Sequence, residues 1–273
     1  MTDVQSLIRK DAKRQLLMGS LFITGMLSFT ITFLYTMEES LLIGAFYGIL
    51  FGAIGIALVR SGWKDSIKAK QSLQFVHDCS VETFKRVPKR MYIGHRASSI
   101  FHAKLYDMDG EVYSEIRQQK LRGSRVIGTI SSFYAGGWMA PATYQMVGAD
   151  GETSYKIDKK GGTYWRGYVQ HSNGNYVAYT DLKRSKKTGK STFYYIEKDY
   201  YHWKAEGDSH IGHFEVTDGE GRLWAVAKRG AIPIEAADRF DQMPGYLIEW
   251  KVRDDVPHSL VAFLFLLQTS RDV

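Results

Sequence analysis

The chain opens with two long apolar segments separated by a short polar link. Residues 16–35 and 41–59 contain no Asp, Glu, Lys, Arg or His. About 20 apolar residues in a helix cross a hydrocarbon core of roughly 30 Å, and both segments have that length. A buried helix of a soluble core is the alternative, but two uncharged segments side by side favour membrane spans. A cleaved signal peptide is disfavoured because a second span follows the first. The pattern predicts a transmembrane helical hairpin.

Charged residues predict which way this hairpin points. The cations that precede the first span and follow the second are Arg9, Lys10, Lys13, Arg14, Arg60, Lys64, Lys68 and Lys70. The link at 36–40 holds two glutamates and neither Lys nor Arg. Because Lys and Arg accumulate on the cytosolic side, both termini are expected in the cytosol and the link outside. The predicted location is the cell membrane, with two spans and a cytosolic C-terminal part.

Small residues mark one face of the second span. Gly44, Gly48, Gly52 and Gly55 fall almost on one helical face, where the absence of side chains lets a second helix approach closely. The partner is either the first span of the same chain or another molecule, in a homo-oligomer or with a different membrane protein. Neither span holds an Asp, Glu, Lys, Arg or His that would mark an ion or proton path.

After residue 60 the pattern changes to a β-rich one. A basic connector, residues 60–90, has eight basic and three acidic residues, and a short helix is expected within 73–84. Beyond it, short aromatic and β-branched runs alternate with glycine turns, at Asp109-Gly110, Asp150-Gly151, Asn173-Gly174 and 219–221. Such turns need positive φ angles, which glycine adopts freely. About a dozen strands between 100 and 252 predict a sandwich or a barrel.

An apolar run near the C-terminus favours the barrel over the sandwich. Residues 260–267 follow Pro257 and are hydrophobic without interruption. They are too few to span a bilayer, and a helix that is apolar all round has to be buried. A meander ending in such a helix predicts an antiparallel barrel wrapped around it. The expected organisation is a basic N-terminus at 1–15, the hairpin at 16–59, the connector at 60–90 and a barrel domain at 91–273.

The segments 214–226 and 144–151, with Asp254-Asp255 ahead of the apolar helix, carry a family resemblance. They resemble the tubby C-terminal-like superfamily, which includes the tubby domain, the phospholipid scramblases and the LURP-one-related proteins. The resemblance covers roughly 91–268 and implies a twelve-stranded barrel around a central hydrophobic helix, with binding of phosphoinositide head groups. The chain departs from the scramblases in carrying its spans ahead of the domain. No lipid-contact motif transfers residue by residue.

Composition and motifs narrow the chemistry. The 273 residues include one Cys and five Pro, with 44% hydrophobic residues, which excludes a disordered chain and an intramolecular disulfide framework. Thr188-Gly189-Lys190-Ser191 resembles the end of a phosphate-binding loop, but Arg184 stands where its first glycine belongs. The eight histidines are expected to be structural or exposed. We expect no catalytic constellation, no metal, no cofactor and no nucleic-acid partner.

The net charge of +7 is concentrated in two places that suit a phosphate-bearing surface. The candidate lipid-binding residues are Arg60, Lys64, Lys68 and Lys70 beside the second span and Lys183, Arg184, Lys186, Lys187 and Lys190 in a predicted hairpin tip. There are simpler explanations of both groups: the cations beside the second span would serve only to orient the hairpin in the membrane, and those in the tip would belong to a solvated loop. The sequence predicts a membrane-anchored cytosolic module that contacts anionic inner-leaflet lipid. The alternative is a regulatory or scaffold subunit that binds a protein partner.

Overall fold

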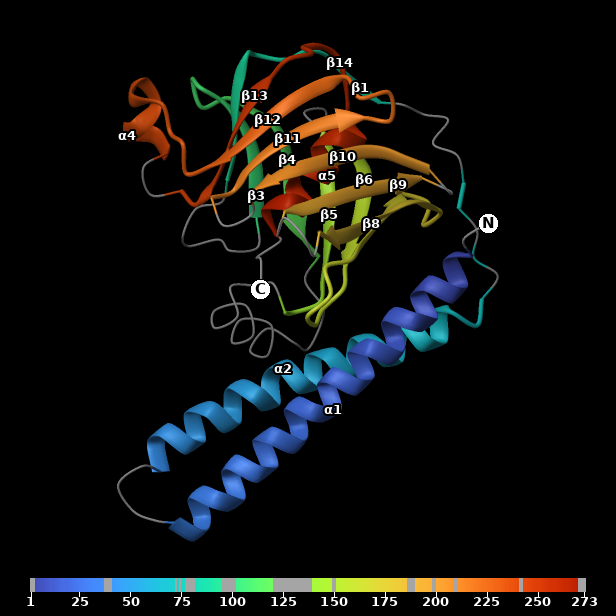
Figure 1. Cartoon of the computed structure of the whole chain (residues 1–273), viewed down its shortest axis with the longest axis vertical. Coiled ribbons are helices and arrows are strands. Elements are labelled where there is room, and N and C mark those ends of the chain that lie inside the picture. Colours follow the sequence, from blue (N-terminus) through green and yellow to red (C-terminus); the bar gives the residue numbers. More distant parts are fainter. Residues whose placement is uncertain are drawn as a thin grey trace.

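The structure is a computed structural model in which a pair of long helices lies beside a β-barrel (Figure 1). It describes residues 3–36, 41–71, 73, 75–76, 82–94, 102–119, 139–148, 151–185, 190–197, 200–208, 211–240 and 243–269. Lys186 and Lys187 of the predicted tip and Asp150 of a predicted turn lie outside these described residues.

Both predicted spans lie within longer helices. Helix α1 covers Val4–Thr36 and α2 covers Leu41–Lys68, and each is long and apolar enough to cross a membrane. Each helix also extends beyond its uncharged segment at the polar end. In the extension of α1, Val4, Ile8 and Ala12 are fully buried and recur every fourth residue, which places them on one helical face.

The glycine face of α2 lies against α1 of the same chain. A Cβ on Gly44 would overlap the ring of Phe33, one on Gly52 would meet Met26 at 2.6 Å, and one on Gly55 would meet Ile23 at 2.8 Å. Gly48 makes an ordinary contact with α1. The structure therefore contains the intrachain packing, and association of two copies through α2 stays a prediction.

The predicted antiparallel barrel is confirmed. Twelve strands close in the order β10-β11-β12-β13-β2-β3-β4-β5-β6-β7-β8-β9. Their bounds are β2 Arg90–Gly94, β3 His102–Asp107, β4 Val112–Gln118, β5 Ala142–Gly148, β6 Thr153–Lys159, β7 Gly167–His171, β8 Tyr176–Arg184, β9 Ser191–Glu197, β10 Tyr200–Asp208, β11 His213–Asp218, β12 Leu223–Arg229 and β13 Gly245–Trp250. A 3-10 helix, η1 (Ile234–Ala236), and helix α4 (Ala237–Phe240) lie between β12 and β13.

Four hairpins at one end of the barrel share one turn design. Gly110, Gly151, Gly174 and Gly221 have φ between 84° and 90°, and each donates its N–H to the carbonyl three residues earlier. The register shifts by one residue beside each turn, which is the bulge that such a left-handed residue produces. The four glycines that the sequence pattern assigns to turns therefore occupy the left-handed turn positions.

Helix α5 (His258–Gln268) fills the barrel, as predicted. Every residue from His258 to Leu267 is buried. Ring contacts hold it in place, with Phe263 against Tyr195 at 5.9 Å and Phe265 against Tyr144 at 4.9 Å between centroids. The interior of the barrel is thus a packed core.

One expectation about the connector is wrong. Residues 83–86 form strand β1 (Thr83–Arg86), which pairs antiparallel with β14 (Asp254–Pro257) in a small separate sheet. A helix reaching position 84 is therefore excluded. His258 explains the pairing, because its Nδ1 lies 3.1 Å from Glu82 and 3.1 Å from Ser154 Oγ while its ring packs on Phe84.

Replacing Gly55 with Leu is expected to force α1 and α2 apart. Its Cβ alone would lie 2.8 Å from Ile23 and 3.0 Å from the carbonyl oxygen of Gly19, so the cost should be about 1–3 kcal/mol. Gly25→Leu is the matched control, since nothing lies within 4 Å of its Cβ position. Thermal unfolding of the full chain in detergent measures the difference. Equal unfolding temperatures for the two variants would contradict this packing.

Candidate functional site

The polar ends of the two helices dock on the outer wall of the barrel. Val4 and Ile8 of α1 are buried against Tyr168 of β7 and against Tyr176 and Tyr179 of β8. These tyrosines project outward from their strands, because their neighbours Val169, Val177 and Ala178 belong to the inner core. The bulge opposite Val169 and Gln170 allows the consecutive Val177 and Ala178 both to do so. The wall formed by β6, β7 and β8 is therefore an internal interface of the protein.

A buried ion cluster lies at the centre of this interface. The Nζ of Lys160, just after β6, is 2.7 Å from Asp65 of α2 and 2.9 Å from Asp158 of β6. Gln15 of α1 donates its side-chain N–H to the second oxygen of Asp65 at 3.0 Å. Asp65 is 2% exposed, Lys160 4% and Asp158 9%. One cation thus joins both helices to the barrel wall.

A second buried group contacts α1 alone. Tyr168 donates its hydroxyl to Asp11 at 2.6 Å, and the guanidinium of Arg166 lies 3.6 Å from the same carboxylate. Arg166 also donates to the backbone carbonyl of Thr180 at 3.0 Å. The two groups adjoin, since the Nζ of Lys160 lies 5.3 Å from the ring of Tyr168. Unpaired buried charges are costly, so these contacts specify one orientation of the helices.

Electrostatics keep Asp158 and Lys160 charged. Burial by itself would raise the pKa of Asp158, but attraction to Lys160 and Lys68 and hydrogen bonds from Lys160 and Thr143 hold it at about 2. Burial would lower the pKa of Lys160, but Asp158 and Asp65 outweigh this and raise it above its ordinary value. Asp158 and Lys160 therefore stay ionised at physiological pH, whereas burial raises the pKa of Asp65 in spite of its contact with Lys160.

The contacts along α1 show which end of the barrel lies nearest to the uncharged segment of this helix. Ile8 meets the beginning of β8, the guanidinium of Arg14 lies 4.3 Å from the ring of Tyr164, and Met18 lies beside Gly162. Tyr164 and Gly162 belong to the β6–β7 connection, at the end of the barrel where β6, β8 and β10 finish. We call this end the span-side rim, because α1 continues from it into its uncharged segment. The opposite end, with the four glycine turns, is the far rim.

The predicted lipid-binding residues separate into two groups. Arg60, Lys64 and Lys70 are exposed on or just after α2, whereas Lys68 lies 3.5 Å from Asp158 and belongs partly to the interface. Lys183 and Arg184 are exposed at the end of β8, and Lys190 is exposed just before β9. The pairing of Arg184 with Ser191 brings these three cations together at the span-side rim.

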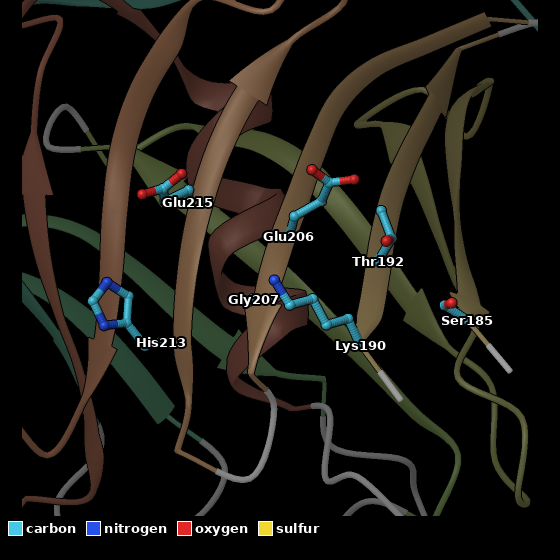
Figure 2. Close-up of a pocket in the computed structure, with 7 residues that line it drawn as sticks. All are labelled: Ser185, Lys190, Thr192, Glu206, Gly207, His213 and Glu215. Atoms are coloured by element: carbon cyan, nitrogen blue, oxygen red, sulfur yellow. The ribbon is translucent and has the colours of Figure 1, made fainter. Parts of the chain in front are cut away.

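A shallow groove of about 500 Å³ lies on the outer wall next to this rim (Figure 2). Its lining residues come from the ends of β8 and β9 and from β10 and β11; they are Ser185, Lys190, Thr192, Glu206, Gly207, His213 and Glu215. Glu206 and Glu215 are directly opposite each other in the ladder. The groove combines a cation, two carboxylates and two hydroxyls.

The described residues hold no group of three or more His, Cys, Asp or Glu that could bind a metal ion. Sequence reasoning did not single out Asp11, Asp65, Lys160 or Arg166, which form the buried interface. The available signal was an isolated acidic residue on each helix, Asp11 among four cations and Asp65 beside Lys64.

Comparisons with known proteins add little. No family model matches the chain, and no curated protein matches it. The X-ray structure of a protein from Arabidopsis thaliana aligns with a TM-score of 0.42 at 11% identity, over 69% of this chain and 94% of that one. At this level the similarity assigns no function to the chain.

Replacing Lys160 with Met is expected to destabilise the full chain by about 3–5 kcal/mol, because it leaves two buried carboxylates without their cation. The matched control is Lys64→Met, which removes an exposed cation beside Asp65. Thermal unfolding in detergent, followed by tryptophan fluorescence, compares them. If both variants unfold like the unmodified chain, the buried ion cluster does not hold the helices to the barrel.

Lys159 predicts a pH dependence of stability. It is 2% exposed, donates to the carbonyl of Ala140 at 3.1 Å, and burial lowers its pKa to about 7. Between pH 7 and about 10.5 the unfolded chain holds a proton that the folded chain has released, so this residue makes stability rise with pH in that window. Lys159→Met should flatten the rise and stabilise the protein at pH 7 by about 1 kcal/mol or more. Unfolding midpoints measured from pH 6 to 10 test this, and an unchanged slope would contradict it.

Proposed function

We propose that the chain is a membrane-anchored binding module. In this proposal residues 16–35 and 41–59 cross the cell membrane, both termini are cytosolic, and the span-side rim of the barrel contacts anionic head groups of the inner leaflet. The observation that carries the proposal is the buried docking of both helices on the barrel wall. This docking fixes which rim lies next to the point where the helices would enter the bilayer.

The charges at that rim have the sign the proposal needs. Lys183 and Arg184 are exposed there, and Arg60 and Lys64 follow the second span on α2. Each basic residue near an anionic bilayer surface contributes about 1 kcal/mol. Ile211, in the β10–β11 turn of the same rim, is 69% exposed. An exposed aliphatic side chain beside cations suits the boundary between head groups and acyl chains.

The family resemblance supports the same class of function. A closed twelve-stranded antiparallel barrel around an apolar helix is the architecture that the tubby C-terminal-like superfamily implies. Membership of that superfamily is part of the proposal. Head-group binding at a membrane is the activity it would bring.

The test uses the full chain, because removing the helices would expose Lys160 and Arg166 on the barrel wall. The protein is reconstituted in mixed phosphatidylglycerol and phosphatidylcholine, re-extracted in detergent, and its bound lipid is measured by mass spectrometry. We expect salt-sensitive enrichment of phosphatidylglycerol. Changing Arg60, Lys64, Lys183 and Arg184 to Ala should reduce this enrichment by about fivefold or more.

The control replaces four exposed cations outside the span-side rim, namely Lys85, Arg86, Lys89 and Lys251. It removes the same charge and should leave the enrichment unchanged. Loss of enrichment in both variants would indicate an effect of net charge alone. Absence of phosphatidylglycerol enrichment in the unmodified chain at low salt would overturn the proposal.

A further inference from the structure

The groove beside the span-side rim differs in charge from the rim itself. Among its lining residues Lys190 is the only basic one with a permanent charge, against the carboxylates of Glu206 and Glu215. A surface built for a purely anionic ligand would not place two carboxylates beside its cation, since like charges disfavour that ligand. The groove therefore calls for a ligand that carries both signs.

The two carboxylates favour a positive charge beside them. Glu206 and Glu215 are cross-strand partners, an arrangement in which like charges repel. Lys204 offsets one of them, with its Nζ 3.3 Å from Glu206. Among the residues that the structure describes, none forms a hydrogen bond or an ion pair with the side-chain carboxylate of Glu215. A ligand ammonium beside Glu215 would relieve the repulsion and form charge-assisted hydrogen bonds.

The remaining groups suit a phosphate. Figure 2 shows the side chain of Lys190 extending toward Gly207 of β10, with Glu206 and Glu215 above it in the view. Ser185 and Thr192 lie on the β8–β9 side of the groove, and Glu215 lies on the β11 side. The ammonium of Lys190 and the hydroxyls of Ser185 and Thr192 suit a phosphate. The carboxylate of Glu215 on the other side suits a cation linked to that phosphate.

We infer that this groove binds a phosphoethanolamine group, with its phosphate at Lys190, Ser185 and Thr192 and its primary ammonium at Glu215 and Glu206. Choline is disfavoured, because it has no N–H to donate and none of the seven lining residues is Phe, Tyr or Trp, the rings that bind quaternary ammonium groups. The inference rests on the proposed function for its source of ligand. In the proposed orientation the groove opens next to the bilayer surface, which makes an ethanolamine phospholipid the occupant.

The experiment compares lipids retained by the full chain after reconstitution in equal amounts of phosphatidylethanolamine, phosphatidylcholine and phosphatidylglycerol. We expect phosphatidylethanolamine to be enriched over phosphatidylcholine. Glu206→Gln with Glu215→Gln should lower that ratio about tenfold, the effect of losing a hydrogen bond between charged groups. The control is Glu111→Gln with Glu220→Gln, two exposed glutamates in far-rim turns, which should leave the ratio unchanged.

A second arm identifies the source of the ligand. Soluble glycerophosphoethanolamine should displace the bound lipid, and glycerophosphocholine should not. Binding of the soluble compound without enrichment of the lipid would overturn the membrane source.

An unchanged phosphatidylethanolamine ratio in Glu206→Gln with Glu215→Gln, with unfolding as in the unmodified chain, would overturn the groove as the site. The phosphatidylglycerol ratio in the same samples reports on the proposed function separately, so failure of one is distinguishable from failure of the other.

Discussion

The position of one buried cation constrains most of this structure. Lys160 lies between Asp65 of α2 and Asp158 of the barrel, and Gln15 of α1 completes the contact through Asp65. Buried ion pairs are weak sources of stability, because desolvation offsets much of the attraction, but a misplaced partner is costly. The cluster therefore acts mainly on orientation. It fixes which strands face the helices, and with them which rim lies toward the apolar segments.

Close backbone approach makes that orientation possible. A Cβ on Gly62 of α2 would lie 2.9 Å from the carbonyl of Ala12, and one on Gly161 would lie 2.7 Å from Leu58. Gly44, Gly52 and Gly55 likewise let α2 lie close to α1 along the rest of their contact. Gly62 thus brings α1 and α2 together, and Gly161 lets α2 approach the barrel wall closely enough for the short side chain of Asp65 to reach Lys160. Packing and electrostatics specify the same arrangement, which is the consistency expected of a unique fold.

Sequence alone predicted the features that depend on local patterns. The two long apolar helices follow from uninterrupted hydrophobicity, the four far-rim turns from glycine, and α5 from an apolar run that had to be buried. It did not predict the helix extensions or the buried interface. Asp65 and Lys160 are 95 positions apart, and a single aspartate among lysines resembles a solvated helix face. Adjacent Lys159 and Lys160 look equivalent in sequence, yet Lys160 lies between two carboxylates, whereas Lys159 donates to the carbonyl of Ala140 and burial lowers its pKa.

The filled interior decides where a ligand can bind. Because α5 occupies the barrel, a binding site has to lie on the outer wall or at a rim. The β6–β8 wall is covered by the helices, whereas the wall from the ends of β8 and β9 to β11 carries the groove. Glu206 and Glu215 meet there only because the β10–β11 hairpin has this register, and a shift of one residue would turn one of them inward. The groove and the helix interface thus use different sectors of the same barrel, so the proposed head-group contact would not compete with docking of the helices.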